Sequence, residues 1–579
     1  MNKITLVFYF SLFSVVGFAQ NNLVEYKSRP KEFENFQTIS DSVVALKTIS
    51  EQVSSPSFQS KLPYPILFIH GLNSSSETWN TTTTYFDSQY SYTFGGRFDF
   101  CLNADSTNST TNKNFYPTAN ADIIAFETSV QNGDYYYINF NVNPNGAIGT
   151  TVLSNQSAVA KQGAALKVAI QRVMEITGKN KVILASHSMG GLASREYIQN
   201  SENWQSDNYH HVAKLLCIAT PNGGSNASDN ALAFFTGTDL QSEAIRDLKS
   251  TYYYSGEAGR YLFGGNEIQD ASNMNDNSNT PDFYNVDINC NGITGESIFG
   301  LNQKPIDNFI DYSCFIGRIT NFFGTNLTTD GIVAEPSSNL NHYYPSLIYP
   351  AKLFYYNSGY DLIENHTELT SYYYQIMQGL DEPNFKELAY VIDTNKIYYG
   401  FTTIQNPVAE DVDYFKFTVA DTINATVSIS NIVTSSMNAS IFDASGVAVG
   451  AIQNNSGSNL NFNRTLSPGD YFLKISSTNP TNTNYQTPYQ FTISTTLSDN
   501  DVDVETLIFY PNPVEDVLHL DHFEIQKATI YNLSGQWISE KQFENQTTNT
   551  LDLSELASGM YLIKLKNNTE ERTIKIIKK

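Results

Sequence analysis

The segment that most constrains the fold is a short apolar run that ends in a turn of small residues. Lys181-Val-Ile-Leu-Ala185 has the composition of a buried strand, and Ser186-His-Ser-Met-Gly-Gly191 follows it directly. The next residues, Leu192 to Ile198, have the composition of a helix. Small residues let such a helix pack close behind the strand, while the sharp turn exposes the hydroxyl of Ser188. The segment therefore predicts an α/β fold with a strained, accessible serine.

Further strand and helix patterns support this α/β prediction. A helical pattern over residues 158–177 carries apolar side chains at helical spacing, and Gly178 lies where a C-terminal cap belongs. The predicted strands are residues 64–70, 122–127, 181–187, 213–220, 312–319 and 351–356. Strands separated by helices indicate a mostly parallel sheet with helices on both faces.

The 579 residues are enough for several domains. Residues 1–20 have the basic start, apolar core and small-residue end of a signal peptide. The α/β domain is predicted over residues 21–388, with a cap insertion at about 225–310. Period-two alternation then predicts a β-sandwich over residues 389–498 and a second all-β module over residues 499–579.

The composition excludes several partners and cofactors. Acidic residues outnumber basic ones 58 to 34, and the net charge of −24 disfavours nucleic acid and anionic membranes. Past the signal peptide no stretch approaches the roughly 18 apolar residues of a membrane span, so the mature protein is predicted to have no transmembrane segment. Four cysteines are too few for a disulfide scaffold and lack the spacing of a zinc site. Cys217 is predicted to be a buried thiol, Cys290 and Cys314 could form a single bridge, and Cys101 is unassigned.

A serine nucleophile needs a base, and the base needs an acid that orients it. In a strand–turn–helix elbow these partners follow the serine in the order acid, then histidine. His366 lies just after the last predicted strand, which makes it the predicted base. Asp330, before Gly331, is the predicted acid, with Asp311 and Asp361 as competitors and a turn aspartate as the structural alternative.

Catalysis also needs donors for the oxyanion of a tetrahedral intermediate. One predicted donor is the backbone amide of Met189, directly after the nucleophile. The other is the amide of Leu72, because Phe68-Ile-His-Gly-Leu72 is an apolar strand that ends in a loop with a glycine. His70 is expected to hydrogen-bond the backbone of this loop.

These motifs together resemble the bacterial triacylglycerol lipase and esterase branch of the α/β-hydrolase superfamily. The residues that carry the resemblance are His70-Gly-Leu72, Ser186-His-Ser-Met-Gly-Gly191, Thr220-Pro-Asn-Gly-Gly-Ser225, Asp330-Gly-Ile-Val333 and Asn365-His366. It implies Ser188 as nucleophile, His366 as base, Asp330 as acid, and an oxyanion hole from the amides of Leu72 and Met189. The chain departs from the family pattern at Ser186, usually glycine, and at Asn222, often histidine.

The cap insertion contains aromatic clusters that could shape an acyl-chain pocket or simply pack within a large insertion. Asp287-Ile-Asn289-Cys-Asn291-Gly292 begins like a calcium loop, but Ile298 stands where a bidentate acid is expected. Glu368 could serve a calcium ion near the histidine, as in some related lipases. No cofactor is predicted, and a structural calcium ion is left open.

The C-terminal modules resemble two families of secreted bacterial proteins. The segment from Asp411-Val-Asp-Tyr-Phe-Lys-Phe417 to Tyr471-Phe-Leu-Lys-Ile475 resembles the pre-peptidase C-terminal β-sandwich. Tyr510-Pro-Asn-Pro513, Ser558-Gly-Met-Tyr-Leu-Ile563 and the basic end resemble the C-terminal sorting domain of type IX secretion. That resemblance implies the type IX machinery as a partner and a secreted or cell-surface location in a Gram-negative bacterium.

The leading functional hypothesis is a secreted carboxylic-ester hydrolase, of lipase type, that acts on ester or lipid substrates through an acyl-enzyme. An acyltransferase or a phospholipid deacylase with the same three residues is the alternative among enzymes. A non-catalytic surface adhesin, with the β-sandwich as the working part, is the alternative from another class.

Overall fold

The computed structural model describes most of the chain outside its N-terminal segment and the predicted cap. The described residues are 37–38, 58–103, 123–148, 153–225, 242–248, 262–263, 265–266, 297–298, 300–319, 327–358, 364–403, 411–433, 436–477, 487–497, 507–521, 523–543, 548–567 and 571–579. The predicted signal peptide, the predicted calcium loop up to residue 296, and Asp361 therefore lie outside the described residues.

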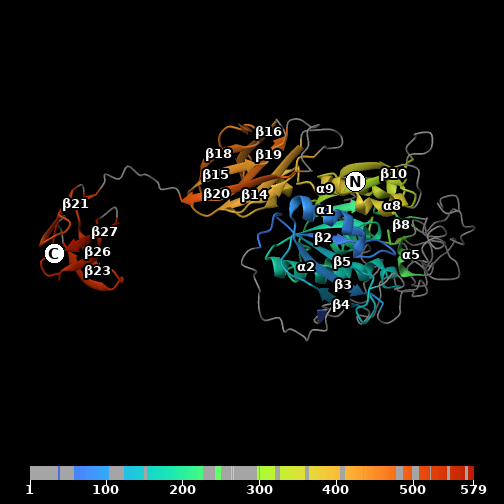
Figure 1. Cartoon of the computed structure of the whole chain (residues 1–579), viewed down its shortest axis with the longest axis horizontal. Helices are drawn as coiled ribbons and strands as arrows, with labels where there is room; N and C mark the ends of the chain where they lie inside the picture. Colours follow the sequence, from blue (N-terminus) through green and yellow to red (C-terminus); the bar gives the residue numbers. More distant parts are fainter. Residues whose placement is uncertain are drawn as a thin grey trace, which may run out of the picture. The chain divides into compact units, whose positions relative to one another are not determined.

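A mostly parallel sheet forms the core of the first domain (Figure 1). In the part of the chain that the structure describes it has nine strands, in the order β1-β4-β3-β5-β2-β6-β7-β10-β11. Only the β3–β4 pair is antiparallel. The strands are β1 (Gln37–Thr38), β2 (Ile66–Ile69), β3 (Phe94–Cys101), β4 (Ile124–Thr128), β5 (Tyr135–Asn139), β6 (Val182–His187), β7 (Val212–Ile218), β10 (Asp311–Ile319) and β11 (Lys352–Ser358). The predicted fold class is confirmed, with β1, β3 and β5 as strands that the prediction lacked.

Helices accompany this sheet, and two of them matter most for the site. The longest, α2 (Val159–Thr177), buries its apolar face and ends at Gly178, whose φ of 67° is left-handed. Helix α3 (Met189–Gln199) begins directly after the serine turn and is buried along its whole length. The others are α1 (Asn80–Tyr90), α5 (Glu243–Leu248), α6 (Glu335–Ser338), α7 (Leu340–Tyr343), α8 (Glu364–Glu368) and α9 (Tyr373–Gly379). No helix among the described residues combines the length and apolar character needed to cross a membrane.

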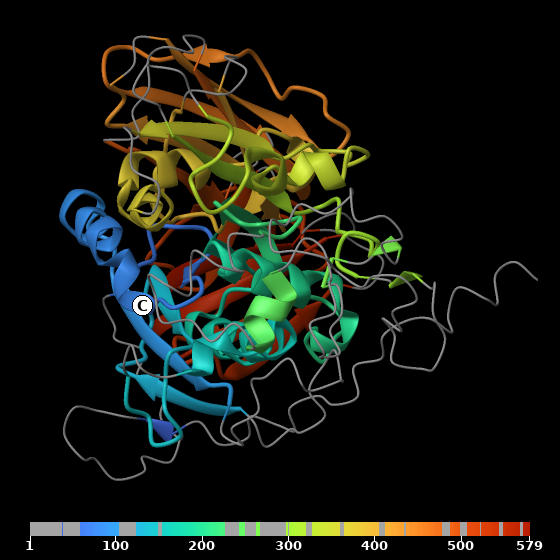
Figure 2. The same cartoon turned by 90° about the vertical axis from the view of Figure 1, so that its right-hand side faces the viewer.

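Two packed sheets form the β-sandwich that follows (Figure 2). One has the order β12-β14-β19-β16-β17 and the other β13-β20-β15-β18. Their bounds are β12 (Tyr390–Val391), β13 (Tyr398–Gly400), β14 (Asp411–Val419), β15 (Ile423–Ser430), β16 (Met437–Asp443), β17 (Gln453–Asn454), β18 (Leu460–Leu466), β19 (Gly469–Ser477) and β20 (Tyr489–Leu497). Alternate residues of β14 are buried, as a strand with one face on the core requires.

The α/β domain and the sandwich share one hydrophobic core. Both belong to the compact unit Met1–Leu497. Aromatic contacts join them: the rings of Tyr64 and Tyr390 lie 5.4 Å apart, and those of Tyr90 and Phe401 lie 5.1 Å apart. Aromatic pairs in such edge-on arrangements stabilise an interface beyond their buried area. The junction between the two domains is therefore a packed interface.

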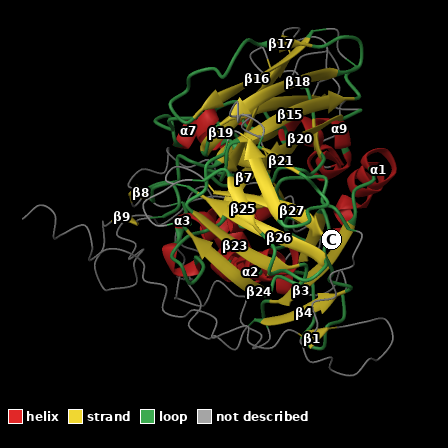
Figure 3. Ribbon diagram, turned by 90° about the vertical axis from the view of Figure 1, so that its left-hand side faces the viewer, coloured by secondary structure: helices red, strands yellow, loops and turns green. Residues whose placement is uncertain are grey.

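A separate unit, Ser498–Lys579, contains the last all-β module, of which β21, β23, β24, β25, β26 and β27 are labelled in Figure 3. Its strands are β21 (Ile508–Tyr510), β22 (Val517–Asp521), β23 (Lys527–Asn532), β24 (Trp537–Gln542), β25 (Thr550–Asp552), β26 (Gly559–Lys566) and β27 (Glu571–Lys578). Two small sheets enclose a core of buried aliphatic residues, among them Leu518, Ile530 and Ile576.

Cys101, Cys217 and Cys314 are free and buried. Cys314 on β10 lies opposite Cys217 on the neighbouring strand β7, inside the sheet. Cys314 thus forms no disulfide, and the alternative of a bridge from it to Cys290 is wrong. Cys290 itself lies outside the described residues.

Candidate active site

The turn between β6 and α3 holds Ser188 in a strained backbone conformation. Its φ is 52° and its ψ is −126°, a combination that side chains rarely adopt. The Ser188 amide donates to the carbonyl of Ile218 on β7 at 2.8 Å, which fixes the turn to the sheet. A side chain at Gly190 would come within 2.5 Å of the His70 carbonyl oxygen, so this position has no room for one. The arrangement is that of a nucleophile elbow.

Ser186, which departs from the usual glycine, has a partner of its own. Its hydroxyl lies 2.7 Å from the hydroxyl of Ser194, one of the buried residues of α3, and Ser194 in turn donates to the Gly190 carbonyl. The buried hydroxyl is therefore satisfied within the elbow. Serine in place of the usual glycine therefore leaves no unpaired hydroxyl in the elbow.

Ser188, His366 and Asp330 lie in one line of hydrogen bonds. The His366 Nε2 lies 3.0 Å from the Ser188 Oγ, and the His366 Nδ1 lies 2.6 Å from the Asp330 Oδ2. All three side chains are buried or nearly so. They come from the end of β6, the loop after β10 and the short helix α8 after β11, which brings residues 178 positions apart into contact. The chemical roles assigned to them remain predictions.

The carboxylate of Asp330 is satisfied on both oxygens. Its Oδ1 accepts the backbone amides of Ile332 at 2.9 Å and Val333 at 2.7 Å, while Oδ2 faces His366. Gly331 has a φ of 94°, which lets the backbone curl around the carboxylate. The competitor Asp311 instead forms an ion pair with Lys214 at 2.5 Å.

His187 contributes to the site in a way that the sequence did not predict. Its Nε2 lies 2.9 Å from the backbone carbonyl oxygen of His366, so the neutral ring holds the loop of the predicted base. Burial, followed by the proximity of His366, lowers the pKa of His187 to about 3. The ring is therefore uncharged at neutral pH and adds no positive charge beside His366.

The loop after β2 packs against the other side of the nucleophile. A side chain at Gly71 would lie 2.8 Å from the Cβ of Ser188. The His70 Nδ1 bonds the Gly71 carbonyl and its Nε2 accepts the Phe140 amide, each at 2.8 Å, so His70 bonds backbone as predicted. Among the described residues no hydrogen bond uses the amide of Leu72. This amide and that of Met189 at the start of α3 are thus available to a bound oxyanion.

An apolar cluster lies beside the nucleophile. It combines residues from α2 and α3 with residues from the predicted cap: Val159, Ala160, Met189, Leu192, Ala244, Ile245, Leu248, Leu262, Phe263 and Leu301, with Leu72 packed against them. Helix α5 from the predicted cap is fixed against the start of α2 by two hydrogen bonds. The Glu243 carboxylate accepts one from the Ala158 amide, and the Asp247 carboxylate accepts one from the Val159 amide. The cluster packs the described part of the predicted cap against α2 and α3 beside the nucleophile.

The remaining histidines of the α/β domain have other partners. His210 pairs with Asp307 and His211 pairs with Asp207, while His342 lies exposed on α7. Asn222, the second departure from the family pattern, accepts from the buried Arg195 at 3.2 Å. It therefore holds the loop after β7 and does not contact the predicted catalytic residues.

Comparison with known proteins gives matches at both ends of the chain. Residues 63–250 match the model of a PGAP1-like alpha/beta domain, and residues 508–579 match that of a secretion system C-terminal sorting domain. No curated protein matches the chain in sequence. The predicted α/β-hydrolase domain and the type IX sorting tail are thereby confirmed.

Three solved structures resemble parts of the chain. A Listeria innocua gene product is 14% identical with a TM-score of 0.31, over 56% of this chain and 96% of its own. An extracellular α/β-hydrolase from a Paenibacillus species is 10% identical with a TM-score of 0.24, over 55% and 99%. The pre-peptidase C-terminal domain of a Bacillus anthracis collagenase is 20% identical with a TM-score of 0.16, over 20% and 99%.

The sheet order, the elbow and the first family match define the N-terminal domain as an α/β-hydrolase. The C-terminal sorting domain makes this hydrolase a secreted or cell-surface protein that uses the type IX machinery.

Proposed function

We propose that this protein is a serine carboxylic-ester hydrolase in which Ser188 is the nucleophile, His366 the general base and Asp330 the orienting acid. The observation that carries the proposal is the continuous hydrogen-bond path from the Ser188 Oγ through the His366 ring to the Asp330 carboxylate. The path starts from a serine in the strained conformation of an elbow.

In the acylation step the Ser188 Oγ attacks the carbonyl carbon of the ester while its proton passes to the His366 Nε2. Asp330 keeps the Nδ1 proton of His366 in place and stabilises the imidazolium that forms. The oxyanion accepts hydrogen bonds from the backbone amides of Leu72 and Met189. Each of these hydrogen bonds lowers the activation free energy by roughly 3–4 kcal/mol. His366 then gives its proton to the leaving alkoxide, and an acyl-serine remains.

In the deacylation step His366 takes a proton from water, and the resulting hydroxide attacks the acyl carbon. Collapse of the second tetrahedral intermediate returns the proton to the Ser188 Oγ and releases the acid. The neutral His187 assists by holding the His366 backbone without a competing charge.

The proposed substrate is a lipid ester of the acylglycerol type. The apolar cluster that includes Met189, Leu192 and Phe263 packs beside the nucleophile, and we expect an acyl chain to bind against such side chains. A secreted or cell-surface location gives the enzyme access to such external substrates.

The test is covalent labelling of the full chain by a fluorophosphonate probe, alongside hydrolysis of p-nitrophenyl esters of two to sixteen carbons. Ser188→Ala should abolish labelling and reduce kcat/KM by about 10⁵-fold or more. Ser88→Ala, which removes an exposed hydroxyl on α1, serves as the matched control and should change neither.

Labelling of Ser188→Ala at the wild-type rate would contradict the assigned nucleophile. An optimum at long acyl chains is expected, and an optimum at acetyl esters would contradict the lipid-ester substrate. When an alcohol acceptor is added, the free acid should remain the main product. A new ester as the main product would indicate an acyltransferase instead.

A further inference from the structure

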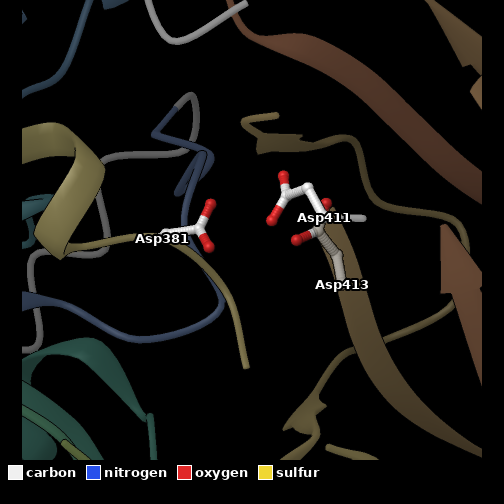
Figure 4. Close-up of side chains that lie close together, drawn as sticks. All are labelled: Asp381, Asp411 and Asp413. Carbon is white, nitrogen blue, oxygen red and sulfur yellow. The ribbon is translucent and has the colours of Figure 1, made fainter. Parts of the chain in front are cut away.

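Three aspartates converge at the junction of the α/β domain and the β-sandwich (Figure 4). Asp381 follows α9 at the end of the α/β domain, and Asp411 and Asp413 lie on β14 of the sandwich. One carboxylate oxygen from each lies within 4.8 Å of the other two. The side chains are buried, with at most 1% of each residue exposed. We call Asp381, Asp411 and Asp413 the junction cluster.

Period-two alternation explains how two of these acids reach the interior. Asp411 and Asp413 lie on the buried face of β14, in line with Phe415 and Phe417. These are positions where apolar side chains are expected, because a carboxylate out of water costs several kcal/mol unless it is paired. The junction cluster therefore needs a compensating positive charge.

The lysines of the junction supply only part of that charge. Lys214 is paired with Asp311 at 2.5 Å. Lys352 lies 3.4 Å from the Asp381 Oδ2 and 2.8 Å from the Glu382 carbonyl oxygen. In the described part of the junction these two lysines face five buried carboxyl groups, those of Asp311, Asp381, Glu382, Asp411 and Asp413. Backbone amides also donate to two of them, from Thr403 to Asp411 at 2.7 Å and from Phe401 to Glu382 at 3.3 Å.

One oxygen of the junction cluster has no partner among the described residues. The Tyr489 hydroxyl donates to the Asp413 Oδ2 at 2.5 Å, but the Asp413 Oδ1 is buried without a hydrogen bond. Figure 4 shows its carboxyl group turned toward Asp381. In a cation-binding site, the carboxylate oxygens that bind the ion have no protein hydrogen-bond partner and lie close to other carboxylates. The Asp413 Oδ1 matches this description.

We propose that the junction cluster is a calcium site that joins the hydrolase domain to the β-sandwich. Three carboxylates are hard oxygen donors, which Ca²⁺ prefers. Two oxygens bound to one Ca²⁺ at about 2.3–2.6 Å can be at most about 5.2 Å apart, and the separations of at most 4.8 Å within the junction cluster lie below that limit. The site is distinct from the sequence segment that begins at Asp287.

The position of the site gives the ion a structural role. Asp381 is the contribution of the α/β domain, and Asp411 and Asp413 are that of the sandwich, so one ion draws both domains together. Extracellular calcium modules bind with dissociation constants of about 10⁻⁴–10⁻³ M. Docking of the sandwich would then be completed in a calcium-containing medium outside the cell.

The first test is thermal unfolding of the full chain after treatment with EDTA and after addition of CaCl₂ or MgCl₂. The wild type should gain about 2–5 °C in Tm at 2 mM CaCl₂. Asp413→Asn should lose this gain, and Asp421→Asn, which removes an exposed aspartate from the same sandwich, should keep it. Asp413→Asn should also unfold no earlier than the wild type in EDTA, since it relieves repulsion, which separates loss of the site from a folding defect.

The second test is terbium luminescence excited through tyrosine, because Tyr489 bonds directly to the junction cluster. Tb³⁺ emission that Ca²⁺ displaces should fall at least fivefold in Asp413→Asn and stay unchanged in Asp421→Asn. Equal Tm gains for the wild type and Asp413→Asn, or no gain for either, would overturn the site. An equal gain with Mg²⁺ would overturn the choice of calcium.

Discussion

The predicted active site and the domain junction both bury carboxylates, but they treat them in opposite ways. At the active site Asp330 accepts two backbone amides on one oxygen and faces His366 with the other. At the junction Asp413 has a single hydrogen bond and lies among other acids. The first carboxylate has hydrogen-bond partners for both oxygens from its own loop and from His366, whereas the second is left with one oxygen unpaired among the described residues.

The hydrogen-bond partners of a buried carboxylate distinguish a preorganised catalytic charge from a cation site. A catalytic acid has to be ionised before the substrate arrives, so its partners are fixed protein dipoles. A cation site has to leave oxygens open for the ion, so its protein partners are incomplete. Changes in the two regions should consequently affect different quantities: activity at Asp330, and cation-dependent stability at the junction.

Asp330→Asn should produce the largest effect of these changes. The amides of Ile332 and Val333 would hold the oxygen of the new side chain, so its NH₂ group would face the His366 Nδ1. That stabilises the tautomer with a protonated Nε2, which cannot take the Ser188 proton, and kcat should fall by about 10⁴-fold.

The measurement for Asp330→Asn is kcat on a p-nitrophenyl ester, with the exposed Asp207→Asn as the matched control. Asp207→Asn should keep kcat within about twofold of the wild type, because its carboxylate lies at the surface. A decrease of less than tenfold in a folded Asp330→Asn protein would remove Asp330 from the proposed mechanism.

Lys352→Met should produce the largest effect at the junction. Burial lowers the pKa of Lys352, but the nearby carboxylates, Asp311 and Asp381 foremost, outweigh it and raise the pKa above the ordinary value. Removing this charge leaves buried acids without their lysine, so the free energy of unfolding in EDTA should fall by about 3–5 kcal/mol.

Urea unfolding in EDTA measures this loss, with Lys396→Met as control. Lys396 forms a surface pair with Asp393, both about half exposed, so its removal should cost at most about 1 kcal/mol. If both substitutions lowered the free energy of unfolding equally, Lys352 would stabilise the protein no more than a surface lysine does.

Local patterns in the sequence predicted the parts of the molecule that local physics determines. The apolar run before Ser186 and the small residues after it predicted strand β6, the turn and helix α3. The order of acid and histidine after the serine, together with their positions after predicted strands, favoured Asp330 and His366, which the structure brings into hydrogen-bond contact. Strand β3 was missed because glycines and a charged Arg97–Asp99 pair interrupt its apolar pattern.

Contacts between distant segments could not be predicted in this way. His187 bonds the carbonyl of His366, a residue 179 positions away, and nothing in its own neighbourhood indicates that partner. The junction cluster likewise depends on how the sandwich docks against the end of α9. One signal was present: the alternation of β14 places Asp411 and Asp413 on the same face as Phe415, where two acids are out of place.

Glu196→Gln tests a third kind of buried acid, because Glu196 on α3 lies outside both the predicted active site and the junction cluster. Its Oε2 has no hydrogen bond within the described residues, and burial raises its pKa to about 7. Between the ordinary value near 4.5 and about 7, the folded protein holds a proton that the unfolded chain has lost. The free energy of unfolding should therefore fall as the pH rises through this window.

At pH 8 the ionised side chain should cost the wild type roughly 3 kcal/mol, and Glu196→Gln should recover most of it. At pH 4.5 the two proteins should be nearly equal. Urea unfolding at both pH values measures the difference, with the half-exposed Glu175→Gln as control. A Glu196→Gln advantage that is the same at both pH values would contradict the raised pKa.

Tyr489→Phe should produce the smallest effect and the most specific one. The Tyr489 hydroxyl holds one oxygen of Asp413 and thereby turns the other toward the junction cluster. Removing this hydroxyl should lower the free energy of unfolding in EDTA by about 1 kcal/mol. It should also raise, by about tenfold, the calcium concentration that gives half of the Tm gain, as for other groups that orient a metal ligand.

Tyr414→Phe, on the opposite face of β14, is the control for Tyr489→Phe. If both variants respond to calcium like the wild type, Asp413 does not depend on Tyr489 for its orientation. A shift only for Tyr489→Phe would show that the junction, unlike the loop of Asp330, is organised for an ion.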